Sequence, residues 1–132
     1  MIVFCNGCFD VLHIGHVKLI EYCRDLAGRD GTVIVGINSD ASVKRLKGPS
    51  RPVNTLIHRI HVISAIKYVD FIETFEEDTP IELIKRVRPD IIVKGGDYKP
   101  QEVVGYGLAV VRIFNYIEGY STTKTLQDLS GG

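Results

Sequence analysis

The chain has 132 residues and an ordinary mixture of apolar and charged side chains, so we expect one globular domain over residues 1–132. Its 16 basic and 16 acidic residues leave no net charge and so give no argument for a nucleic-acid or membrane partner, and we expect neither. No apolar run is long enough to cross a bilayer, no signal peptide is recognisable and the cysteine count is odd, so we expect a cytoplasmic protein with reduced thiols.

Short apolar runs and helix-like patterns alternate along the chain. The apolar runs predict strands over 2–5, 32–37, 70–75, 91–94 and 109–114. Periodicity and capping residues predict helices over about 16–26, 41–46, 55–68, 80–87 and 122–129, with Thr79 and Ser121 as caps and Pro80 at a first helical position. The segment 99–108 is ambiguous and fits one helical turn.

This alternation predicts an α/β fold, with a doubly wound, mostly parallel five-stranded sheet and helices on both of its faces. Ligands of such sheets bind beyond the carboxyl ends of the strands. Four segments are expected to meet at that edge, namely 7–16, 38–47, 95–98 and 120–124.

The segment 7–16 joins the first predicted strand to the first predicted helix. It combines Gly-x-Phe-Asp with His-x-Gly-His, so His13 and His16 are expected to share one face of a first helical turn. A helix start offers unpaired N–H groups and partial positive charge, and Gly15 has no side chain to keep a phosphate away. Both imidazoles can donate hydrogen bonds to a polyphosphate, more strongly when protonated. The stretch therefore predicts a phosphate site, in preference to a turn with two incidental histidines.

The same stretch also admits zinc binding. Cys5-x-x-Cys8 and His13-x-x-His16 carry the ligand types that zinc prefers. Against zinc, Cys5 lies within a predicted strand and need not converge with Cys8, and the interval between the two pairs is much shorter than in a zinc finger. A thiol redox role is weaker still, because the cysteine pair precedes the turn and does not begin a helix.

Three further segments carry candidate ligand-binding residues. The basic run from Lys44 to Arg51, with Arg59 beyond it, is either a solvated charged face or a flap whose cations neutralise a transferring phosphoryl group. In 94–98, two glycines allow close approach of a ligand and Asp97 can accept hydrogen bonds from a ribose or base, unless the segment is only a turn. The segment 120–124 is either an ordinary capped helix start or a second phosphate site rich in hydroxyls.

Gly-x-Phe-Asp-x-x-His-x-Gly-His with a late Ser-Thr-Thr-Lys resembles the nucleotidyltransferase superfamily, in particular its small cytidylyltransferase-like group. Longer matches over 38–48, 51–53, 75–80 and 93–100 resemble the adenylyltransferase domain of bacterial ADP-heptose synthases. The resemblance covers nearly the whole chain and implies a Rossmann-like nucleotidyltransferase fold. It also implies a reaction in which an oxygen of a sugar 1-phosphate, with heptose 1-phosphate as the expected sugar, attacks the α-phosphorus of ATP in line, and pyrophosphate leaves with Mg²⁺.

The resemblance also implies roles for individual residues. The implied catalytic residues are His13, His16, Lys44 and Lys47. The implied nucleotide-binding residues are Gly7, Cys8, Phe9, Gly15, His16, Arg59, Gly95, Asp97, Ser121, Thr122 and Thr123. Asp10 would face the acceptor or orient a cation, Arg51 would bind the acceptor, and no side chain is assigned as a metal ligand.

Other functions remain open from the sequence. A glycerol 3-phosphate cytidylyltransferase that uses CTP would end in the same Ser-Thr-Thr-Lys, a nucleotide sensor would bind without turnover, and a zinc module would use the cysteines. The segment 103–110 is shorter than in the family, which affects the expected base preference and any homodimer contact. The synthases often carry a kinase domain ahead of this one, so here the phosphorylated sugar is expected from another protein.

Overall fold

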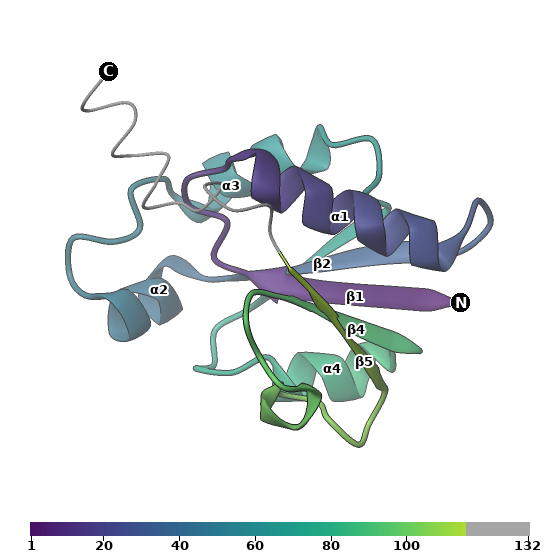
Figure 1. Ribbon diagram of the computed structural model, residues 1–132. Coiled ribbons are helices and arrows are strands. Elements are labelled where there is room, and N and C mark those ends of the chain that lie inside the picture. The colour runs from purple at the N-terminus through teal and green to yellow at the C-terminus, as the bar shows by residue number, and fades with distance from the viewer. Residues whose placement is uncertain (116–132) are drawn as a thin grey trace.

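The computed structural model describes residues 1–115, and the expected helix 122–129 with its cap Ser121 lies outside the described residues. Five strands form one sheet in the order β3-β2-β1-β4-β5, and all neighbours are parallel (Figure 1). The strands are β1 (Ile2–Gly7), β2 (Thr32–Asn38), β3 (Phe71–Phe75), β4 (Ile91–Gly95) and β5 (Val110–Phe114). The helices are α1 (Ile14–Ala27), α2 (Asp40–Lys47), α3 (Leu56–Ser64) and α4 (Ile81–Val87), with a short 3₁₀ turn η1 (Pro100–Glu102). The predicted doubly wound α/β fold is confirmed.

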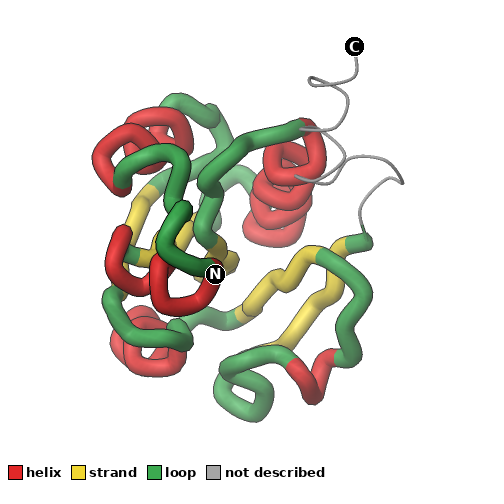
Figure 2. The backbone as a smooth tube through the Cα atoms, turned by 90° about the vertical axis from the view of Figure 1, so that its left-hand side faces the viewer, coloured by secondary structure: helices red, strands yellow, loops and turns green. Residues whose placement is uncertain are grey.

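The direction of winding reverses next to the central strand. The chain runs outward from β1 to β2 and β3, and then returns to the other side of β1 for β4 and β5. The carboxyl ends of β1 and β4 therefore border the crevice in which doubly wound sheets bind ligands. Figure 2 looks onto this edge of the sheet.

Helices cover both faces of the sheet and create two hydrophobic cores (Figure 1). On one face, α1 and α3 pack against Val3 and Cys5 of β1, and on the other face α4 packs against Phe4. Successive side chains of a strand point to opposite faces, so a strand covered on both sides needs apolar residues at every position. This requirement explains the uninterrupted apolar run in β1. Among residues 1–115, no helix has the length and hydropathy needed to cross a membrane.

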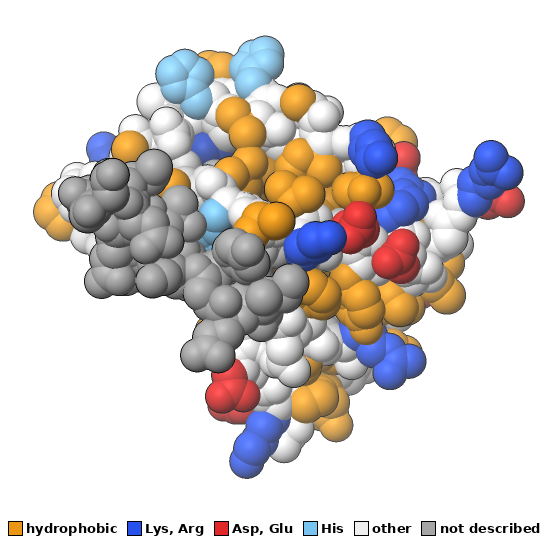
Figure 3. All heavy atoms as spheres, turned by 45° about the horizontal axis from the view of Figure 1, so that its top comes forward, with side chains coloured by type: hydrophobic (Ala, Val, Ile, Leu, Met, Phe, Trp, Pro, Cys, Tyr) orange, Lys and Arg blue, Asp and Glu red, His pale blue; other side chains and the backbone are white. Residues whose placement is uncertain are grey.

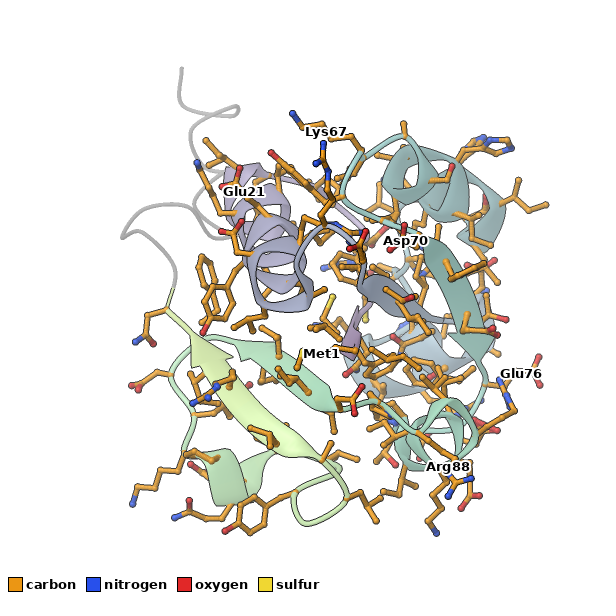
Figure 4. All side chains as sticks on the ribbon, turned by 90° about the vertical axis from the view of Figure 1, so that its right-hand side faces the viewer. Met1, Glu21, Lys67, Asp70, Glu76 and Arg88 are labelled. Atoms are coloured by element: carbon orange, nitrogen blue, oxygen red, sulfur yellow. The ribbon has the colours of Figure 1, made fainter. Side chains whose placement is uncertain are left out.

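The opposite, amino edge of the sheet is fixed by a separate polar network. Asp70, which precedes β3, accepts a hydrogen bond from the backbone N–H of Val33 (2.8 Å) and pairs with Arg24 of α1. Arg24 also donates to the carbonyls of Gly28 and Gly31, in the turn that follows α1. Figure 4 faces this edge and shows Asp70 at the start of β3. These contacts lie at the far end of the sheet from the switch-point crevice.

Several helix boundaries differ from the predictions. α1 begins earlier than predicted because His13 acts as its N-cap. α3 ends at Ser64 and not near residue 68, because the residues that follow donate to carbonyls three positions back in tighter turns. The prediction of Thr79 as a cap is wrong, since Pro80 occupies the N-cap position of α4. Ser39 caps α2, because its hydroxyl accepts a hydrogen bond from the backbone N–H of Ser42 (3.2 Å).

Candidate functional site

The loop after β1 has a constrained backbone. Phe9 has a φ of 49°, a left-handed conformation that is uncommon for residues other than glycine, and its ring is buried. A Cβ added at Gly7 would lie 3.2 Å from Cε2 of that ring, so a larger residue at position 7 would crowd it. The ring also meets His16 edge-on, with 5.5 Å between the centroids. Phe9 thus packs the loop against the start of α1. Residues in such a left-handed conformation cluster at functional sites.

The two histidines of the first helical turn cap the helix reciprocally. Nδ1 of His13 accepts a hydrogen bond from the backbone N–H of Gly15 (3.0 Å), and Nδ1 of His16 accepts one from the backbone N–H of His13 (3.2 Å). The rings share one face of the helix, as predicted, with centroids 4.0 Å apart. Because each Nδ1 is an acceptor, the proton of each neutral ring lies on Nε2. His13 also takes the N–H of Gly15, which the sequence had suggested for a phosphate.

Both imidazoles are neutral at physiological pH in the protein without ligand. Burial, and then the charge of His13, lower the pKa of His16 from 6.5 to about 4. Burial also lowers the pKa of His13. The predicted strengthening by protonation therefore depends on an arriving anion, whose negative charge would raise both pKa values.

A cavity of about 140 Å³ opens between the ends of β1 and β4 and the start of α1. We call it the His16 cavity, and its lining residues are Asn6, Gly7, Cys8, Phe9, His16, Leu19, Lys94 and Gly95. Five residues that the resemblance assigned to the nucleotide therefore meet in one place, namely Gly7, Cys8, Phe9, His16 and Gly95. Asp97 is exposed in the loop beyond β4, and Ser121, Thr122 and Thr123 lie outside the described residues.

Sequence reasoning missed two polar residues of this cavity as site residues. Asn6 and Lys94 are polar positions near the ends of the otherwise apolar strands β1 and β4. Lys94 is half-buried, and its ammonium lies over the ring of Tyr98, 5.0 Å from the centroid. A polar residue at the carboxyl end of a buried strand next to the switch point was the signal that could have identified both.

Asp10 links the loop between α2 and α3 to the loop after β1. Its buried carboxylate accepts hydrogen bonds from Nε of Arg51 (2.9 Å) and from the backbone N–H groups of Val53 and Asn54 (2.7 Å each). Burial raises the pKa of Asp10, but the bonds from Asn54, Val53 and Arg51 outweigh it and hold the pKa below its ordinary value. The partners of this carboxylate are therefore groups of the loop 48–55, whereas the family resemblance implied an acceptor or a cation as its partner.

Arg59 is a buried cation at the junction of four segments. It is 1% exposed, and its guanidinium donates to the carbonyls of Cys8, Asn38 and Asn54 and to the carboxylate of Asp40. These bonds join the ends of β1 and β2 to the starts of α2 and α3. The expected contact of Arg59 with a nucleoside stays a prediction, and the geometry gives this residue a positioning role.

The remaining basic residues lie on the last turn of α2 and are exposed. Lys44 and Lys47 do not line the His16 cavity, while Arg45 pairs with Asp78 (2.9 Å) and donates to the carbonyl of Glu76. The flap interpretation therefore rests on Lys44 and Lys47, because Arg45 is committed to the loop after β3.

The four side chains of the zinc alternative do not converge. Cys5 is buried in the α1 core, where it contacts Cys23 and raises the pKa of that thiol. Within residues 1–115, no group of three or more histidine, cysteine or acidic side chains is arranged to hold a metal ion. The zinc module is therefore not supported by the geometry of these residues.

Doubly wound sheets commonly bind phosphate-bearing ligands where a helix begins at the switch point, and the His16 cavity lies at that place. Fold and site together are those of the nucleotide-binding class of α/β proteins. Comparison with known families narrows this class: the chain belongs to the cytidylyltransferase-like family, whose model matches residues 4–127. This is the family group that the sequence motifs predicted.

Known relatives are similar over nearly the whole chain. The bifunctional protein HldE of a Nitratiruptor species is 54% identical over 96% of this chain, and that of Campylobacter jejuni is 50% identical over 97%. The chain spans 27% of the length of each of these relatives. Among solved structures, a lipopolysaccharide core biosynthesis protein from Thermoplasma volcanium is similar with a TM-score of 0.70 and 26% identity, covering 89% of this chain and 96% of that one.

Proposed function

We propose that this chain transfers AMP from ATP to heptose 1-phosphate and releases pyrophosphate. An oxygen of the sugar phosphate forms a bond to the α-phosphorus, and the bond from that phosphorus to the oxygen of the leaving pyrophosphate breaks. The product is an ADP-sugar, a precursor for lipopolysaccharide. The observation that carries the proposal is the His16 cavity at the switch point, together with about half of the residues being identical to HldE proteins.

The histidines and the backbone around Phe9 would stabilise the charge that develops on the phosphates. Both imidazoles carry their proton on Nε2, so they can donate hydrogen bonds to phosphate oxygens without a change of protonation. The backbone of 7–9 borders the same cavity and would position the α-phosphate. Positioning and charge stabilisation are sufficient for this chemistry, so no covalent enzyme intermediate is needed.

Nucleotidyltransferases use divalent metal ions, and we propose Mg²⁺ for this one. Mg²⁺ is usually bound by one or two carboxylates together with substrate phosphates. Within residues 1–115, no cluster of acidic side chains is arranged for an ion, and the carboxylate of Asp10 is already bonded to Arg51 and two backbone N–H groups. The ion would therefore enter as part of the substrate MgATP.

The exposed cations of α2 and of the following loop would approach the acceptor side. Lys44 and Lys47 lie on the last turn of α2, directly before the loop that Asp10 holds. Arg51 contacts Asp10 through Nε, and its side chain is partly exposed, so its terminal nitrogens would still be able to donate to an acceptor phosphate. These cations would neutralise the acceptor phosphate as it meets the α-phosphate.

A matrix of nucleotides against phosphorylated acceptors tests the proposal. Pyrophosphate release is measured with ATP or CTP, each combined with heptose 1-phosphate, hexose 1-phosphates or glycerol 3-phosphate. We expect release with ATP and heptose 1-phosphate. Release only with CTP and glycerol 3-phosphate would reject the adenylyl proposal in favour of the cytidylyl one. Nucleotide binding without release in any combination would identify a sensor.

A further inference from the structure

A second cavity adjoins the His16 cavity, around the end of β4. It measures about 130 Å³, and we call it the Tyr98 cavity. Its lining residues are Asn6, Pro80, Lys94, Tyr98, Glu102, Val103 and Val104. Asn6 and Lys94 line both cavities, so these two side chains form the boundary between them.

We infer that the Tyr98 cavity binds the sugar ring of the phosphorylated acceptor. The inference rests on the proposed function, because transfer requires the acceptor phosphate to reach the α-phosphate of a nucleotide in the His16 cavity. A ligand in the Tyr98 cavity meets this requirement at the shared boundary. Lys94 stands there with a cation that can face both phosphates.

The side chains of the Tyr98 cavity have the chemistry that a sugar needs. The amide of Asn6 offers a donor and an acceptor, Lys94 offers donors, and the carboxylate of Glu102 accepts. Glu102 is oriented by the backbone N–H of Lys99, which donates to Oε1 (2.8 Å). The half-exposed ring of Tyr98 adds a flat apolar surface against which the C–H groups of a sugar can pack.

An alternative cavity beside α3 is larger but offers few polar side chains to a sugar. It measures about 390 Å³, and we call it the His58 cavity; its lining residues are Phe9, Asp10, Leu12, Asn54, His58, Arg59 and Val62. The polar side chains of Asp10, Asn54 and Arg59 already form hydrogen bonds with neighbouring loops and helices of the protein. His58 is therefore the principal polar side chain that this cavity could offer to a ligand. Figure 3 shows histidine side chains at the α3 end of this face, next to exposed hydrophobic ones. A sugar placed there would lose hydrogen bonds to water without replacing them.

The Lys94 ammonium assists the transfer without changing its balance. The acceptor phosphate oxygen is already deprotonated, so its lone pair forms the new bond to the α-phosphorus while pyrophosphate takes the electrons of the broken bond. No proton has to leave, and Lys94 contributes only positive charge where the two anionic groups approach each other.

Kinetics of Glu102→Gln test the sugar subsite. Gln keeps an oxygen for the N–H of Lys99 and removes the carboxylate charge, so the fold around η1 is preserved. We expect the KM for heptose 1-phosphate to rise about tenfold, because roughly one charge-assisted hydrogen bond is lost. The KM for ATP should be unchanged. His58→Gln is the matched control in the alternative cavity and should change neither KM. An increase of the sugar KM in His58→Gln, with Glu102→Gln like the wild type, would overturn the inference.

Binding measured by NMR separates the inference from the proposed function. Heptose 1-phosphate is titrated into the ¹⁵N-labelled full chain in the presence of a non-hydrolysable MgATP analogue. We expect amide shifts in 94–104 that Lys94→Gln abolishes. Shifts confined to 54–62, or no shifts, would refute the sugar subsite even if the enzyme turns over. If shifts occur in 94–104 and the separate assay with ATP and heptose 1-phosphate releases no pyrophosphate, the subsite stands and the proposed reaction fails.

Discussion

At the scale of single residues, the histidine pair is organised by backbone hydrogen bonds. Each Nδ1 accepts a backbone N–H, so the tautomer and the ring orientation are fixed before any ligand arrives. The pKa of His16 near 4 keeps this ring a neutral donor. A neutral imidazole costs less to bury beside the apolar ring of Phe9 than an imidazolium would, and a bound polyphosphate would recover the charge.

Removing the imidazole of His16 should reduce catalysis much more than stability. We expect His16→Ala to lower kcat/KM for ATP by about 10²–10³, the usual effect of losing one donor to a developing charge. The free energy of unfolding should fall by only about 1 kcal/mol, the cost of a lost helix-capping contact. Steady-state pyrophosphate release and urea unfolding give the two values. A variant with wild-type kcat would show that His16 makes no contact with the reacting phosphates.

The lowered pKa of His16 also predicts how stability depends on pH. In the unfolded chain a histidine binds a proton below about pH 6.5, whereas His16 in the folded protein resists protonation down to about pH 4. The unfolded state then binds more protons, so stability is complete above pH 6.5 and falls as the pH decreases towards 4, by up to about 3 kcal/mol. Unfolding curves at pH 7, 5.5 and 4 measure this.

His16→Gln is the control for that dependence, because glutamine keeps an acceptor for the N–H of His13 and does not titrate. Its stability should vary less between pH 7 and 4 than that of the wild type. Parallel curves for the two proteins would mean that the ring is not protected from protonation in the folded state.

At the scale of elements, the strands and the fold class could be predicted because the strands of a parallel sheet are continuous apolar runs in the sequence. The helix ends were less predictable. The periodicity of 55–68 continues past Ser64, but tertiary packing ends α3 in tighter turns. Asp10 and Arg59 could be identified as polar residues near the site, but not as the links between β1 and α3, because their partners lie far away in the sequence.

Arg59, which is buried, should contribute much more to the free energy of unfolding than Arg45, an exposed arginine that also pairs with an aspartate. Arg59→Leu leaves three carbonyls without their donor and the carboxylate of Asp40 without its cation, and we expect a loss of about 3–5 kcal/mol. Arg45→Leu breaks an exposed ion pair with Asp78 and should cost at most about 1 kcal/mol. Denaturant midpoints of both variants make the comparison. Equal losses would show that the buried network is not a stabilising link.

Asp10 should affect the position of the flap, and hence kcat, more than the binding of the nucleotide. Asp10→Asn removes the negative charge that pairs with Arg51. It also weakens the hydrogen bonds that the backbone N–H groups of Val53 and Asn54 donate to this side chain. We expect a lower kcat with little change in the KM for ATP, and a stability loss of about 1–3 kcal/mol at pH 7. Because the folded pKa of Asp10 lies below its ordinary value, this difference should shrink as the pH falls below about 4.

Asp78→Asn, which alters an exposed carboxylate, is the control for the Asp10 variant. It should leave kcat unchanged. If Asp10→Asn instead raised only the KM for the acceptor, Asp10 would bind the acceptor, as the family resemblance implied. Its hydrogen bonds to the loop 48–55 would then be secondary.

At the scale of the whole molecule, the site exists only when distant segments of the chain are assembled. β1 and β4 pair in parallel, Val3 with Ile91 and Phe4 with Ile92, and this register brings Asn6 and Lys94 to the same edge of the sheet. No local pattern in the sequence encodes that adjacency. It follows from the reversal of winding at β1, so the unfolded chain has no equivalent of the His16 cavity.

Nucleotide binding should therefore stabilise the whole fold. A ligand that binds only the folded state adds about 2.7 kcal/mol to the free energy of unfolding at a hundredfold excess over its Kd. We expect MgATP to raise the Tm of the wild type and of His58→Gln equally, since His58 lies outside the His16 cavity. His16→Ala should lose most of the shift. An undiminished shift in that variant would place the triphosphate outside the His16 cavity, because among residues 1–115 His16 is the one imidazole that lines it.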